Sequence, residues 1–142
     1  MKKILSLLLL YILCSCSTFE KTPQRIEYAC VLGKSQFFAE IPNIISAEGF
    51  EIYNVDELRN HIIAVSDTFI DRNQVRLNLT ISYDTSSRHY FVTPSARFTK
   101  DSISKVEYYS EDKMNKHFKT RFQTVLNRLE SYCKGNFFPN RP

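Results

Sequence analysis

The chain has 142 residues, which is the size of one ordinary domain. Its 43% hydrophobic and 24% charged residues argue against a disordered chain. The formal charge of +4 falls to +2 if Lys2 and Lys3 leave with a cleaved leader. Because this balance is nearly neutral and no basic face is clustered, the sequence argues against a nucleic-acid partner.

The N-terminus has the layout of a secretory signal peptide, over residues 1–15. Two lysines precede an apolar run from Ile4 to Leu13. The run is too short to span a bilayer comfortably, since about 20 apolar residues are needed. The expected outcome is export of the chain with removal of this segment.

Leu13-Cys14-Ser15-Cys16 resembles the lipobox of bacterial lipoproteins, with Leu at −3 and a small residue before the modified cysteine. The resemblance implies cleavage before Cys16, a diacylglyceryl group on its thiol, acylation such as palmitate, and a tether over residues 16–25. Ser17, rather than Asp, follows the cysteine; in proteobacterial lipoproteins this implies the outer membrane, facing the periplasm. A plain signal peptide with incidental cysteines, or an uncleaved anchor, is the alternative.

Cys30 and Cys133 remain after the leader and the lipidated cysteine are set aside. An even pair in an oxidising compartment favours a disulfide, here between the two ends of the folded region. Two buried free thiols are the alternative. We expect no metal site, because the chain has no CxxC motif and its histidines (His61, His89 and His117) are scattered.

The hydrophobic pattern predicts a strand over residues 26–32 and then a helix over residues 36–48. Ser35 is the candidate N-cap of this helix, Pro42 should kink it or restart it, and Gly49 should end it. Strands are then predicted over residues 50–55 and 61–70, the second around the apolar run from Ile62 to Val65, over residues 75–84 and 89–98, where apolar and polar residues alternate, and over residues 103–109. Pro94 suggests that the fourth of these lies at a sheet edge or contains a bulge.

A long amphipathic helix is predicted over residues 111–134, with apolar residues at i, i+4, i+7 and i+8 spacing. Ser110 is its candidate N-cap and Gly135 its stop. The expected fold is α+β, an antiparallel sheet of four to five strands with two helices packed on one face. It forms a single domain over residues 26–136, and residues 137–142 form a loose tail.

The order of these elements is similar to that of small α/β envelope lipoproteins, such as those that accompany outer-membrane barrel assembly and lipopolysaccharide insertion. The likeness covers about residues 30–134. It rests on a helix that ends in Ala47-Glu48-Gly49-Phe50, a strand, a polar turn and the run His61-Ile62-Ile63-Ala64-Val65. It implies an accessory or scaffold role and carries over no functional residue except Cys16; Pro42 departs from the clean helix of such modules.

No pattern for catalysis or for a cofactor stands out, so we expect neither an enzyme nor a bound cofactor. Asp67, Asp71 and Asp84 flank turns, where aspartate usually shapes the turn. A basic set on the last helix is expected to be a solvated face, with contact to anionic lipid or an acidic partner as the alternative; its members are Lys113, Lys116, Lys119, Arg121 and Arg128.

The leading hypothesis is a lipid-anchored, non-catalytic module that binds a protein partner in envelope assembly or maintenance. The contact candidates are a sheet edge near Pro94 and the polar strand face of Arg76, Asn78, Thr80 and Ser82. A lipid- or lipopolysaccharide-binding module, with a cavity for an acyl chain under the last helix, is one alternative. A membrane-held inhibitor or immunity protein is the other.

Overall fold

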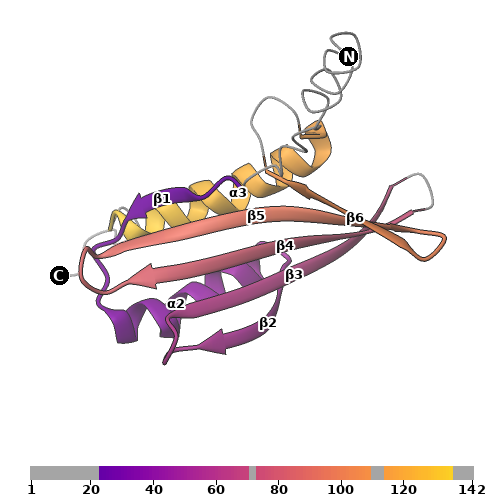
Figure 1. Cartoon of the computed structure of the whole chain (residues 1–142). Helices are drawn as coiled ribbons and strands as arrows, with labels where there is room; N and C mark the ends of the chain where they lie inside the picture. The colour runs from indigo at the N-terminus through magenta and orange to yellow at the C-terminus, as the bar shows by residue number, and fades with distance from the viewer. Residues whose placement is uncertain (1–22, 71–72, 110–113, 136–142) are drawn as a thin grey trace, which may run out of the picture.

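The computed structural model describes residues 23–70, 73–109 and 114–135. These form an α+β fold with six strands and two helices (Figure 1), in the order β1 (Ile26–Ala29), α2 (Lys34–Ala47), β2 (Glu51–Asp56), β3 (His61–Ile70), β4 (Asn73–Asp84), β5 (His89–Lys100), β6 (Ile103–Tyr108) and α3 (Lys116–Cys133). The predicted fold class is confirmed, and the sheet has six strands rather than four to five. The predictions for the leader, for Cys16 and for residues 137–142 lie outside the described residues.

All strand pairs are antiparallel, and the sheet order is β1-β5-β4-β3-β2. Strands β1 and β6 lie one after the other along the edge of β5 that faces away from β4. There β1 pairs with residues 89–92 and β6 with residues 95–100. Two short strands therefore cover one edge of a long one, and β2 forms the opposite edge of the described sheet.

The pattern of β4 decides which face of the sheet is buried. Its odd-numbered side chains, from Val75 to Tyr83, are buried, while the even-numbered ones are exposed or half-buried. Leu79 pairs with Ala64 on β3 and with Pro94 on β5, so the same apolar face continues across the sheet. We call this the inner face and the opposite one the outer face.

Both helices pack on the inner face, as Figure 1 shows. The ring of Phe37 on α2 lies 4.6 Å from that of Tyr83, and the ring of Phe118 on α3 lies 5.5 Å from that of Phe98. Tyr83 and Phe98 belong to the inner face of β4 and β5. The apolar stripes of both helices therefore join the sheet in one core.

Helix α2 differs from its prediction at the start and in the middle. Gly33, and not Ser35, is the N-cap, and the helix continues through Pro42 without a break. Gly49 adopts a φ of 80°, a left-handed conformation that glycine tolerates best, and so ends the helix as predicted.

Helix α3 starts later than predicted. Met114 and Asn115 are not helical, and Asn115 is the N-cap, with its Oδ1 accepting a hydrogen bond from the His117 N–H at 2.9 Å. The predicted start at residue 111 is therefore wrong, and Ser110 lies outside the described residues. The predicted stop at Gly135 is confirmed by its φ of 75°.

Pro94 is neither exposed nor at a sheet edge, which corrects one predicted contact site. It is buried in β5 and pairs with Leu79, at the point where β1 has ended and β6 begins. Its carbonyl accepts a hydrogen bond from the Tyr109 N–H at 3.0 Å. In an antiparallel strand the N–H and the C=O of one residue point to the same side. The N–H that proline lacks would therefore have pointed to the gap between β1 and β6, where no ladder hydrogen bond is lost.

Cys30 and Cys133 form a disulfide, as predicted, with their Cα atoms 4.4 Å apart. The bridge closes a loop of 103 residues and joins the end of β1 to the end of α3. A backbone hydrogen bond from the Val31 N–H to the Cys133 carbonyl, at 3.0 Å, lies beside it. For a loop of this length, chain entropy alone gives a stabilisation of about 4–5 kcal/mol.

Reduction should therefore destabilise the protein strongly. We expect the free energy of unfolding, measured by urea titration of the mature protein, to fall by about 2–5 kcal/mol in reductant. The double variant Cys30→Ala, Cys133→Ala is the matched control and should respond little to the same reductant. Equal responses of the two proteins would show that the bridge contributes nothing.

Candidate functional site

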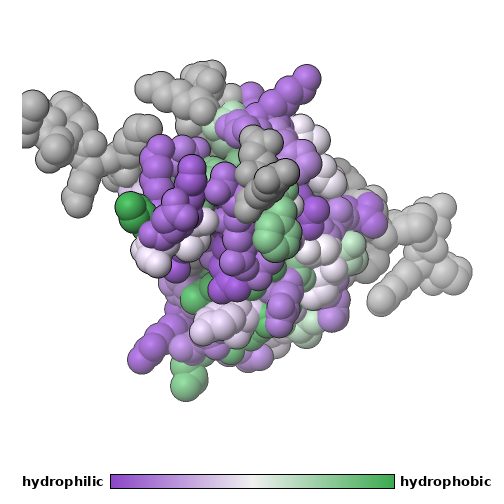
Figure 2. Space-filling view, turned by 90° about the vertical axis from the view of Figure 1, so that its right-hand side faces the viewer, coloured by the Kyte–Doolittle hydropathy of each residue, from purple (hydrophilic) through white to green (hydrophobic). Residues whose placement is uncertain are grey.

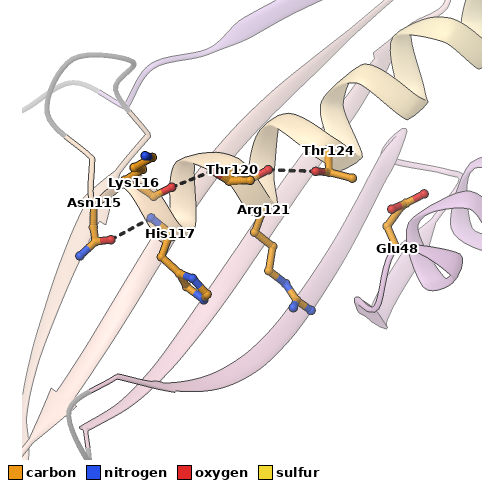
Figure 3. Close-up of a pocket in the computed structure, with 7 residues that line it drawn as sticks. All are labelled: Glu48, Asn115, Lys116, His117, Thr120, Arg121 and Thr124. Atoms are coloured by element: carbon orange, nitrogen blue, oxygen red, sulfur yellow. Dashed lines mark hydrogen bonds between the residues drawn. The ribbon is translucent and has the colours of Figure 1, made fainter.

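Two surfaces of the described residues are the first candidates for binding: a groove beside the start of α3, and the outer face of the sheet. The groove is open to solvent and has a volume of about 680 Å³. Glu48, the C-cap residue of α2, forms one side, and the first turns of α3 form the other (Figure 3), with Asn115, Lys116, His117, Thr120, Arg121 and Thr124.

Arg121 is the residue that joins the two sides of this groove. Its Nη2 donates hydrogen bonds to the Gly49 carbonyl at 3.2 Å and to the Ser66 Oγ at 2.9 Å. Its guanidinium carbon lies 5.7 Å from the centre of the Phe50 ring. The side chain thus links α3, the end of α2 and β3, so its charge stabilises the fold as well as facing the groove.

Most of the other polar groups of the groove are also used locally. The hydroxyls of Thr120 and Thr124 donate to the carbonyls of Lys116 and Thr120, each at 3.0 Å. Glu48 forms an ion pair with Arg128 at 3.6 Å. Because these hydroxyls donate to helix carbonyls and not to a general base, neither threonine is arranged as an activated nucleophile.

Only part of the predicted basic set is a solvated helix face. Lys116 and Arg128 are exposed, although Arg128 also pairs with Glu48, whereas Arg121 is half-buried and bonds to other elements. Lys113 lies outside the described residues. The sequence pattern did not reveal the role of Arg121, because Ser66 and Gly49 are 55 and 72 residues away.

The outer face carries the polar row that the sequence singled out. Arg76, Asn78, Thr80 and Ser82 are alternate residues of β4, and no helix of the described structure covers them. Arg76 binds Asp67 of β3 through two hydrogen bonds of 2.8 Å each. The hydrogen bond from Arg76 lowers the pKa of Asp67, so this carboxylate stays ionised and is not a proton donor near neutral pH.

Apolar side chains share the outer face with this polar row. Val65 of β3 pairs with Asn78 and is only 9% exposed, yet it is outside the main core cluster. On β6, Val106 and Tyr108 are 41% and 38% exposed and pair with Arg97 and Ser95. A polar strip with apolar side chains beside it is a composition found in many protein–protein interfaces.

The other titratable candidates do not come together. Asp67 and Asp84 lie near opposite ends of the β3–β4 ladder, and Asp71 lies outside the described residues. Asp84 accepts hydrogen bonds from Ser86 and Ser87, which lower its pKa to about 2. It shapes the β4–β5 turn, and these two aspartates do not form a catalytic pair.

The three histidines are also dispersed. His61 lies on β3 and His117 lines the groove. The Nδ1 atom of His89 forms a hydrogen bond with the Ser87 carbonyl at 2.8 Å. Within the described part of the chain, no three His, Cys, Asp or Glu residues are grouped closely enough to hold a metal ion. Over the same residues, no helix has both the length and the hydrophobicity to cross a bilayer.

No protein-family model matches the chain, and comparisons with curated proteins and with solved structures found no match.

The link through Arg121 can be tested by substitution. Arg121→Met keeps an apolar stem but leaves the buried Ser66 hydroxyl and the Gly49 carbonyl without this donor. We expect the free energy of unfolding to fall by about 1–3 kcal/mol. Lys116→Met, in the same groove but exposed, is the control and should change it by less than about 0.5 kcal/mol. Similar effects of the two changes would show that the hydrogen bonds of Arg121 do not stabilise the fold.

Proposed function

We propose that the chain is a lipid-anchored, non-catalytic accessory of the bacterial envelope that binds a protein partner through the outer face of its sheet. The observation that carries the proposal is the one-sided packing of the sheet: both helices cover the inner face, and the outer face is left to other contacts. Its anchor is the lipid on Cys16 of the lipobox. Because Ser17, and not Asp, follows this cysteine, the anchor lies in the outer membrane and the chain faces the periplasm.

The composition of the outer face supports a protein partner. Arg76 and Asp67 form a two-bond ion pair on this face, which presents a fixed pattern of charge. Asn78 and Thr80 continue the polar strip, and Tyr108 adds an aromatic side chain of the type enriched in interfaces. Fixed polar groups that share a face with a partly exposed aromatic group favour specific recognition.

A carrier of an acyl chain is supported less well. The inner-face side of α3 is filled by Phe118, Phe122 and Leu129, which are at most 1% exposed. The groove at the helix start is lined by polar and charged side chains, whereas an acyl chain needs an apolar wall. For a membrane-held inhibitor, the same outer face is the contact surface, and the partner would be the enzyme it inhibits.

In-cell photocrosslinking of the full-length chain tests the proposal. A photoreactive phenylalanine analogue replaces Thr80 on the outer face, or Ala39 on the exposed side of α2 as the matched control. We expect one discrete protein adduct from position 80 and none from position 39. Adducts from position 39 alone, or from neither position, would contradict binding through the outer face.

The anchor is tested on the same strains. Cys16→Ala should abolish incorporation of a labelled fatty acid and weaken the adduct at position 80, because the lipid concentrates the chain at the membrane. Cys14→Ala is the control and should keep the label. Persistent acylation of the Cys16→Ala protein would rule out Cys16 as the anchor.

A further inference from the structure

Two long hairpins, β3–β4 and β5–β6, end at the same level at one end of the sheet. Gln74 pairs with Thr99, so the next ladder row brings Asn73 level with Lys100. Asn73 pairs with Ile70, and Lys100 pairs with Ile103. Figure 1 shows both hairpins projecting beyond the helices. We call this the tip end.

Each hairpin carries a large apolar side chain in solvent at this end. Phe69 is 72% exposed and Ile103 is 73% exposed. Figure 2 views the tip end and shows hydrophobic side chains set among hydrophilic ones, without a continuous apolar patch. Separate apolar groups surrounded by polar ones suit shallow insertion among lipid headgroups better than a large protein interface, which has a continuous apolar centre.

The charges of the β5–β6 hairpin agree with a lipid surface. Arg97, Lys100 and Lys105 are exposed cations, and they outnumber the anions Asp101 and Glu107. Lys105 pairs with Glu107 at 3.1 Å. Arg97 and Lys100 are then the cations of this hairpin that can contact a lipid headgroup. Cations next to apolar side chains favour binding to anionic headgroups.

The direction of β1 places the lipidated cysteine within reach of the same end. Ile26 pairs with Val92 and Ala29 with His89, so the chain that precedes Ile26 leaves β1 towards the tip end. From Val92 to Lys100, β5 spans about 27 Å at roughly 3.4 Å per residue. The ten residues from Cys16 to Ile26 reach at most about 33–36 Å when extended.

We propose that the tip end faces the bilayer, and that Phe69 and Ile103 insert into its headgroup region beside the lipid on Cys16. This inference rests on the lipid anchor of the proposed function and adds an orientation to it. The lipid on Cys16, Phe69 and Ile103 contact the membrane at three points and hold the strands roughly perpendicular to it. The outer face is then accessible to a partner in the same membrane.

Single-tryptophan fluorescence tests the orientation, because the chain has no Trp of its own. Full-length lipidated variants Phe69→Trp, Ile103→Trp and Leu58→Trp are reconstituted into vesicles of phosphatidylethanolamine and phosphatidylglycerol, with or without bromine on the acyl chains. Leu58 is the control: it is 95% exposed, in the β2–β3 turn at the opposite end of the sheet. Flotation of the vesicles shows whether the protein is anchored.

We expect the emission of the Phe69→Trp and Ile103→Trp proteins to shift to shorter wavelength and to lose about half its intensity with brominated lipid, while the Leu58→Trp protein shows neither change. Flotation without quenching of either tip variant would overturn the orientation and leave the anchor intact. Quenching of the Leu58→Trp protein instead would place the opposite end at the membrane. Failure of the lipidated chain to float would overturn the anchor and this inference with it.

Discussion

The strict alternation of β4 is the constraint on which the rest of the structure depends. Its apolar side chains, from Val75 to Tyr83, all point to one face, so only that face gains from being covered. Both helices bring their apolar stripes there, and the disulfide between Cys30 and Cys133 joins the first strand to the last helix around this core. One layer of helices is enough to cover it, and no helix of the described residues covers the second face of the sheet.

This arrangement separates the groups that stabilise the fold from those free to make contacts. On the inner side, polar side chains complete the packing: Tyr83 donates to the Leu32 carbonyl at 2.8 Å, and Arg121 joins three elements. The outer face and the hairpin tips instead expose charged, aromatic and aliphatic side chains such as Tyr108 and Phe69. The proposed contacts with a partner and with the membrane are therefore assigned to these surfaces, and not to the groove beside α3.

Much of this fold can be predicted from local pattern, and the failures have physical causes. The bounds of β3 follow from an apolar run between two polar turns, and the buried stripe of α3 follows from helical periodicity. The apolar pattern places the start of α3 too early, because Met114 continues the apolar stripe, yet Asn115 caps the helix after it. Pro94 resembled an edge residue because its missing N–H faces a junction between two strands, which only the tertiary structure creates. The exposure of Phe69 depends in the same way on how far the hairpins project beyond the helices.

The most direct test of one-sided packing compares two neighbouring residues of β4. Leu79 is fully buried on the inner face, and Thr80 lies on the outer face. We expect Leu79→Ala to lower the free energy of unfolding of the mature protein by about 2–5 kcal/mol, and Thr80→Ala to change it by less than about 1 kcal/mol. Equal losses would mean that both faces of the sheet are buried, which would contradict an outer face available to a partner.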